Sequence, residues 1–111
     1  MRTQWSPIEN ESPDFLAQCR GLLGQVWEYK IGHSRLLIRF FQKGSMAGFY
    51  LYCKACDIVH FDAYWQDTNL KIAISEDKYG KLFTITDGER LRIVCRAVFT
   101  GKASQLISIP D

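Results

Sequence analysis

Two cysteines three residues apart, Cys53 and Cys56, form the one recognisable short motif of the sequence. A CxxC pair can supply two thiolates to zinc, or it can form a redox couple at a helix N-terminus. The redox couple needs a βαβ unit around the motif, and the surrounding pattern is typical of antiparallel strands. Zinc would need two further ligands from the remaining thiols and imidazoles, which are Cys19, Cys95, His33 and His60. These form no second spaced pair, so we expect four reduced cysteines, no metal and no cofactor, and keep a zinc-stapled domain as an alternative.

A histidine and a carboxylate two residues apart, His60 and Asp62, would share one face of an extended strand. Histidine beside a carboxylate is the minimal general acid–base pair. Glu89, next to a turn signal, could complete a ribonuclease-like hydrolase site on a helix-plus-sheet scaffold. A solvated histidine at a strand end is the commoner arrangement, so these three residues are weak catalytic candidates and we expect a protein that is not an enzyme.

Arginines and aromatic residues recur at period two in three segments of the chain. Each pair would occupy one strand face: Arg35 with Arg39, Arg92 with Arg96, and Tyr50 with Tyr52. Trp65 lies at another predicted strand end. If these side chains are exposed and neighbouring strands align them, they form a face on which a partner docks. The same rows would suit a single-stranded nucleic acid, whose bases stack on aromatic rings beside cationic groups.

Length and composition limit the classes of function. A chain of 111 residues predicts a single domain over 1–111, and 47% hydrophobic with 23% charged residues is ordinary for a globular protein. The formal net charge of +2 does not demand a polyanionic partner. Apolar runs fall short of the roughly 18 to 20 residues of a membrane span, and the N-terminal residues lack the apolar core of a secretion signal. We expect a cytoplasmic protein without a membrane partner.

The elements that must position these residues follow from periodicity. Ser12-Pro13-Asp14 has the form of a helix start, and the apolar residues that follow recur on one helical stripe, which predicts an amphipathic helix to about Gly24. Period-two patterns then predict strands over 35–41, 49–53, 70–75, 82–86 and 90–99, with a short edge strand over 106–109. Residues 57–65 fit a strand and a helical turn equally well. Asp87-Gly88 predicts a hairpin, and 76–81 a polar loop.

One helix followed by strands with hairpin-length connections predicts an α+β fold. We expect the N-terminal amphipathic helix to pack on a curved, mostly antiparallel sheet of about six or seven strands, sandwich-like or barrel-like. An aromatic content of 14% exceeds what a core of this size requires. The leading hypothesis is therefore a small intracellular binding module that recognises a protein partner or a small apolar ligand through its sheet face, and a homodimer is compatible with it. A single-stranded nucleic-acid-binding domain is the first alternative.

Overall fold

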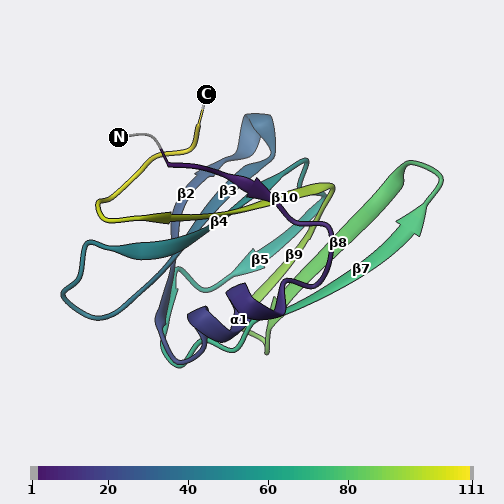
Figure 1. Cartoon of the computed structure of the whole chain (residues 1–111). Helices are drawn as coiled ribbons and strands as arrows, with labels where there is room; N and C mark the ends of the chain where they lie inside the picture. Colours follow the sequence, from purple (N-terminus) through teal and green to yellow (C-terminus); the bar gives the residue numbers. More distant parts are fainter. Residues whose placement is uncertain (1–2, 111) are drawn as a thin grey trace.

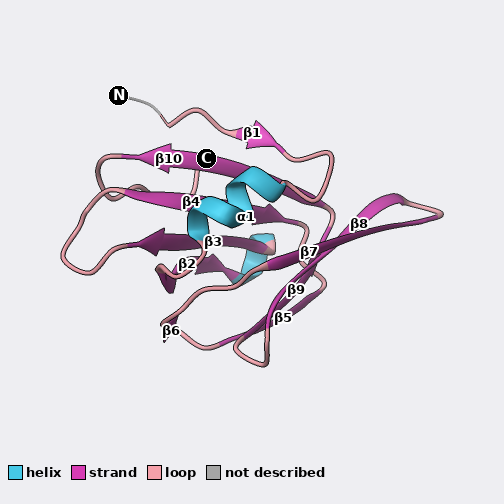
Figure 2. Ribbon diagram, turned by 60° about the horizontal axis from the view of Figure 1, so that its bottom comes forward, coloured by secondary structure: helices cyan, strands magenta, loops and turns pink. Residues whose placement is uncertain are grey.

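Within residues 3–110, the part of the chain that the computed structural model describes, ten strands pair into two antiparallel sheets (Figures 1 and 2). Sheet A has the strand order β1-β10-β4-β3-β2-β6, and sheet B the order β5-β9-β8-β7. The strands of sheet A are β1 (Ser6–Pro7), β2 (Leu23–Lys30), β3 (Arg35–Phe41), β4 (Gly48–Lys54), β6 (Tyr64–Trp65) and β10 (Ala97–Ala103). The strands of sheet B are β5 (Ile58–Phe61), β7 (Lys71–Asp77), β8 (Gly80–Asp87) and β9 (Leu91–Cys95).

The central strands of sheet A are buried on both faces because each face is covered. Along β3, Leu36, Ile38 and Phe40 point into a first core between the sheets. Leu37 points to the opposite face and belongs to a second core with Tyr50, Tyr52 and Ile109. Residues 104–110, which we call the C-terminal segment, run along that outer face of sheet A and supply Ile107 and Ile109 to the second core. A strand buried on both faces needs apolar residues at nearly every position, which Arg35–Phe41 provides.

A bulge in β2 lets two consecutive side chains serve the same face of sheet A. Val26 lies opposite Ile38, whereas Glu28 lies opposite Leu37, so Trp27 is the extra residue of the strand. Trp27 packs on the second core, and the Glu28 carboxylate also accepts a hydrogen bond from the C-terminal segment. Bulges commonly re-aim side chains in this way.

The N-terminal helix is shorter than the sequence predicts. Helix α1 covers Pro13–Cys19, with Pro13 in its first turn as expected, but Ser12 has φ 50° and its side chain makes no capping hydrogen bond. The predicted continuation to Gly24 is wrong. Gly21 has φ +81°, a left-handed conformation that ends the helical region in a turn. A Cβ at Gly24 would stand 2.5 Å from the Trp65 ring, so glycine is needed there for the close approach of β2 to that ring.

The sheet-dominated, antiparallel architecture is confirmed. The predicted curved sheet of about six or seven strands, sandwich-like or barrel-like, is instead ten strands in two sheets, neither closed within the described residues. The predicted strand over 90–99 breaks at Arg96, so that β9 belongs to sheet B and β10 to sheet A. Residues 57–65 are extended, as β5 and β6. The polar loop predicted over 76–81 contracts to a two-residue turn, because Asp77 pairs with Gly80. The segment 106–109 forms no strand.

The Asp87-Gly88 hairpin is confirmed: Asp87 pairs with Leu91, and Gly88 has φ +56°. An additional one-turn 3₁₀ helix, η1 (Ile31–His33), joins β2 to β3. In the described range, no helix has both the length and the apolarity needed to cross a membrane.

Candidate functional site

Four of the seven predicted binding residues lie on the outer face of sheet A. Arg39 stands directly opposite Tyr50 across β3 and β4, and Tyr52 stands opposite Leu37 two positions along. Arg35 precedes them on β3, and burial raises the pKa of the Tyr52 phenol. The predicted alignment of arginine and tyrosine rows is therefore present. Its predicted exposure is wrong, since Tyr50 is 0%, Tyr52 5% and Arg39 6% exposed.

The C-terminal segment covers this face. The indole Nε1 of Trp27 donates a hydrogen bond to the Ile107 carbonyl at 2.8 Å, and the Ile109 N–H donates to the Glu28 carboxylate at 2.8 Å. Arg35 donates to the Pro110 carbonyl at 3.2 Å. Side chains of the sheet thus satisfy the backbone of a segment that has no strand partner, and Ile109 becomes almost completely buried.

The buried cation of this face is already engaged within the chain. The Arg39 guanidinium lies 3.8 Å from the ring centroid of Phe41 and 5.6 Å from that of Trp27, and it donates to the Ser45 carbonyl. Cation–π contact with two rings stabilises a charge that has little water around it. Arg39 therefore acts as part of the second core and is not available to a phosphate.

The other three predicted binding residues lie elsewhere. Trp65 is 4% exposed in the first core, so the predicted exposed face of Tyr50, Tyr52 and Trp65 does not exist. Arg96 forms an ion pair with Asp77 at 2.7 Å at the far end of sheet B. Arg92 is exposed on β9. The arginine rows of β3 and β9 thus belong to different sheets and make no common groove.

The weak catalytic candidates do not assemble into an acid–base site. His60 on β5 is exposed, and its Nε2 lies 3.1 Å from the backbone carbonyl of Glu89. Asp62 uses its backbone N–H to bond the Arg90 carbonyl. Among the described residues, neither carboxylate of the trio pairs with the imidazole. His60 therefore ties β5 to the β8–β9 turn.

Three thiols meet where the two sheets join. The Arg96 N–H donates to the Lys54 carbonyl at 3.2 Å and the Asp57 N–H donates to the Val94 carbonyl at 2.8 Å, which holds the turn containing Cys56 against Cys95. Cys53 and Cys95 are fully buried and Cys56 is half-buried; all are free thiols. Hydrogen bonding to Cys95, then burial, raises the pKa of Cys56. Hydrogen bonding to Cys53 chiefly raises the pKa of Cys95.

This thiol cluster is a core feature in the geometry observed. Cys53 and Cys95 are members of the first core, and Cys56 packs against it. Across residues 3–110, no group of three or more His, Cys, Asp and Glu side chains has the spacing to hold a metal ion. The raised pKa values of Cys56 and Cys95 also leave little of the thiolate form of these two residues, which is the form that metals and oxidants require.

The sequence gives no local signal for two hollows that adjoin α1. Two neighbouring hollows of about 530 and 260 Å³ share Gln18, Phe49 and Lys102 as lining residues, and together we call them the α1 groove. The remaining lining residues are Gln4, Ser6, Phe15, Leu22, Phe40, Phe41, Gln42, Ser45, Ala47, Gly48, Thr100 and Gly101. The lining residues come from α1, β3, β4 and β10 and from the loops beside them. Figure 2 shows α1 lying across this part of sheet A.

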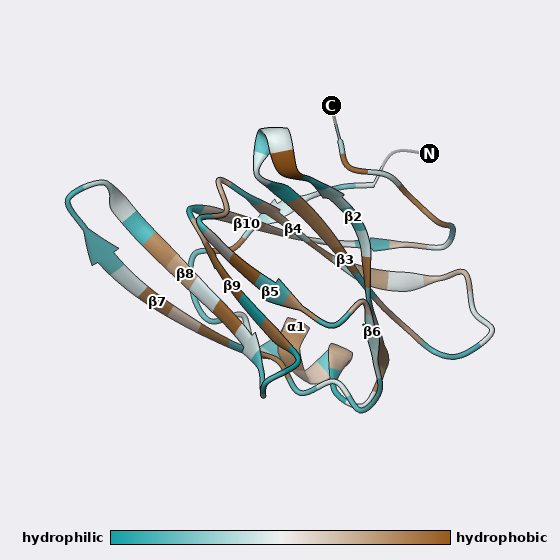
Figure 3. Cartoon of the chain, turned by 180° about the vertical axis from the view of Figure 1, so that it is seen from behind, coloured by the Kyte–Doolittle hydropathy of each residue, from teal (hydrophilic) through white to brown (hydrophobic). Residues whose placement is uncertain are grey.

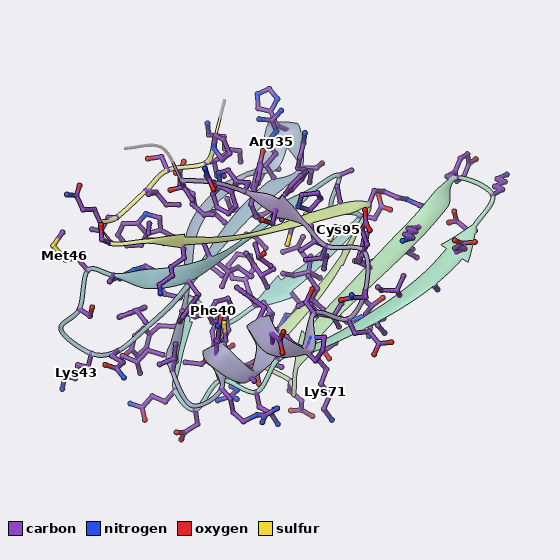
Figure 4. The ribbon with its side chains drawn as sticks, in the orientation of Figure 1. Arg35, Phe40, Lys43, Met46, Lys71 and Cys95 are labelled. Carbon is purple, nitrogen blue, oxygen red and sulfur yellow. The ribbon has the colours of Figure 1, made fainter. Side chains whose placement is uncertain are left out.

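A row of three side chains across adjacent strands forms the floor of the α1 groove. Phe49 pairs directly with Phe40 on β3 and with Lys102 on β10. Phe15 of α1 meets both phenylalanine rings edge-on, at centroid distances of 6.3 and 6.4 Å, and in Figure 4 Phe40 lies behind the helix. The Lys102 ammonium lies 5.5 Å from the Phe49 ring centroid. Only the strand register joins these residues, which explains why Lys102, beyond the predicted end of its strand, was missed.

No protein-family model, curated protein or solved structure matches the chain, so the geometry of the described residues supplies the basis for a functional proposal.

Proposed function

We propose that the protein is a non-enzymatic binding module whose α1 groove takes a small apolar ligand with one acidic group. The observation that carries the proposal is the Phe40–Phe49–Lys102 row, an aromatic floor that ends in an ammonium group. Pockets for small molecules are typically about 300 to 1,000 Å³, apolar, with a few polar groups that fix orientation. The α1 groove falls in that range.

The lining chemistry supports binding over catalysis. The residues around the two hollows include aromatic and aliphatic side chains, glutamine amides and hydroxyls, but no histidine, cysteine or carboxylate. A hydroxyl without a neighbouring base is a poor nucleophile. Lys102 is exposed, so a carboxylate beside it gains a modest electrostatic contribution, while the apolar body of the ligand gains from covering Phe49 and Phe15.

The α1 groove lies next to the C-terminal end of α1. The helix stops at Cys19, and Leu22 then forms the rim of the groove on the way to β2. The groove therefore lies where α1 ends and the chain turns towards β2.

Laurate and dodecanol, which share a twelve-carbon chain, form a matched probe pair for isothermal titration calorimetry. We expect Lys102→Gln to weaken laurate binding about two- to fivefold, the range for an exposed ion pair, and to leave dodecanol binding unchanged. Gln18→Trp, which fills the groove from exposed α1, should abolish binding of both. Lys78→Gln, at an exposed lysine in the β7–β8 turn that lines neither hollow, is the matched control. Laurate binding that is absent, or that survives Gln18→Trp unchanged, would refute the proposal.

The nucleic-acid alternative lacks the platform it requires. Single-strand binding uses exposed aromatic rings beside free cations. Tyr50 and Tyr52 are buried under the C-terminal segment, and Arg96 is paired with Asp77. We therefore favour the small-ligand proposal.

A further inference from the structure

Strand β7 presents an open edge along the outside of sheet B. It is seven residues long, and within residues 3–110 its backbone hydrogen-bonds to β8 alone. Figures 1 and 3 both place it as the outermost strand, in a hairpin that projects from the body of the molecule. The other edge strands are shorter: β5 has four residues, and β1 and β6 have two each.

The edge of β7 lacks the features that normally prevent pairing with another chain. Natural edge strands carry prolines, bulges or central charges that block such pairing. The register of β7 with β8 runs without a bulge from Lys71 to Asp77, and its centre, Ala73-Ile74-Ser75, is uncharged. Charges occur only towards the two ends of the strand. An unprotected edge of this length is a template for a further strand.

The hairpin turn fixes which backbone groups point outward. A two-residue turn leaves Asp77 opposite Gly80, and in such hairpins the flanking residues form a hydrogen-bonded pair. Because hydrogen-bonded and non-hydrogen-bonded pairs alternate, Lys71, Ala73, Ser75 and Asp77 bond to β8. The N–H and C=O groups of Ile72, Ile74 and Glu76 therefore face the open edge.

We propose that a second copy of this chain pairs with the open edge, β7 against β7 in antiparallel orientation about a twofold axis at Ile74. In this register Ile72 lies opposite Glu76 of the second copy and Ile74 lies opposite its equivalent, so the three outward-facing residues of each copy meet. The two sheets B become one continuous sheet. This surface is separate from the α1 groove.

Charge complementarity selects this register. With Ile74 on the axis, Lys71 of each copy stands opposite Asp77 of the other. This adds a second cation, on each side of the axis, to a carboxylate whose two oxygens already accept hydrogen bonds from Arg96 of the same copy. Outward-facing residues can meet only in registers that differ by two residues, and such a slip places Lys71 opposite Ser75 or Tyr79 instead. Ala73 and Ser75 meet between the two Lys71–Asp77 contacts, where their small exposed side chains leave room for close approach. The Arg96 guanidinium holds the pKa of Asp77 at about 2, so its carboxylate is charged at neutral pH.

Analytical ultracentrifugation of the full chain tests the pairing. We expect the mass of the wild-type protein to rise with concentration from 12.8 kDa towards twice that value. Lys71→Asp and Asp77→Lys each place like charges opposite one another in a homodimer, so each variant alone should stay monomeric. An equimolar mixture of the two restores both opposite-charge contacts and should dimerise. Lys43→Asp, the same charge change far from β7, should behave as wild type (Figure 4).

A backbone variant gives a second readout. Glu76→Pro removes an outward N–H without removing a donor of the β7–β8 ladder, so it should abolish dimerisation and keep the wild-type circular dichroism spectrum. A wild-type protein that stays monomeric at millimolar concentration overturns the proposal. So does a dimer that survives Glu76→Pro, or a charge-variant mixture that stays monomeric although both variants are folded.

Discussion

Asp87 is the buried carboxylate on which the junction of the two sheets depends. Its side chain is 2% exposed, and Oδ2 accepts hydrogen bonds from Trp65 Nε1 at 2.9 Å and from the Asn69 N–H at 3.0 Å. Oδ1 accepts from the Arg90 guanidinium at 2.8 Å. The carboxylate thus links the end of β8 to the ring that packs on Gly24 in sheet A.

The cost of replacing Asp87 can be worked out from these three contacts. In Asp87→Asn, the one remaining oxygen can keep Trp65 and Asn69, but the amide NH₂ now faces the Arg90 guanidinium. Loss of one charge-assisted hydrogen bond should lower the free energy of unfolding by about 1.5 to 3 kcal/mol. Asp87→Ala removes all three acceptors and leaves the Trp65 and Asn69 donors without their partner, so we expect a loss of about 3 to 5 kcal/mol.

Urea unfolding at pH 7, followed by far-ultraviolet circular dichroism, measures both values. Tryptophan fluorescence is unsuitable because the substitutions change the surroundings of Trp65 itself. Asp62→Asn is the matched control, since Asp62 is exposed, and it should stay within about 0.5 kcal/mol of wild type. The reasoning is wrong if Asp87→Asn also falls within that interval, or if Asp87→Ala costs no more than Asp87→Asn.

Three further outcomes follow from the other contacts. In the same urea assay, Ile109→Ala should lower the free energy of unfolding by about 2 to 5 kcal/mol. Leu106→Ala, at an exposed position of the same segment, should lower it by less than about 1 kcal/mol. The pKa of Asp77 is about 2 in the folded protein against 3.8 ordinarily, so ionised Asp77 stabilises the fold above pH 3.8 and this contribution disappears as the pH falls through about 2. In a pH titration followed by the carboxyl ¹³C chemical shift, Arg96→Gln should move the midpoint of Asp77 upward. At pH 8, half-buried Cys56 should react slowly with a chromogenic disulfide reagent, because hydrogen bonding and burial raise its pKa, whereas all thiols should react rapidly in urea.

Local patterns were sufficient where an element depends on its own residues. The strand over 35–41 matches β3, and Asp87-Gly88 forms its hairpin, because both follow from side-chain periodicity and from glycine at a left-handed position. The helix end was wrong because the apolar residues after Cys19 fit a helical stripe and a turn followed by a strand equally well. The contact that decides between them is Gly24 against Trp65, which lies far along the chain.

The candidate binding face shows the same division. Period two correctly placed Arg35 with Arg39 and Tyr50 with Tyr52, and the register then aligned these rows. Whether these rows are exposed depends on which other segment packs on them. The apolar residues of the C-terminal segment have the sequence pattern of an edge strand, so the sequence does not indicate that they pack there. Only the folded chain shows that they cover the tyrosines instead.

The two faces of sheet A are covered unequally, and the α1 groove lies on the inner face. The outer face is covered by a segment of the chain, whereas the inner face meets a smaller sheet and a helix of seven residues. The α1 groove lies beside that helix, and the rings of Phe15, Phe40 and Phe49 line it. In sheet B, strands β7 and β8 extend beyond the body of sheet A. In the described part of the chain, β7 pairs with β8 alone. The residues that line the α1 groove include none of β7, so the two proposals can fail independently.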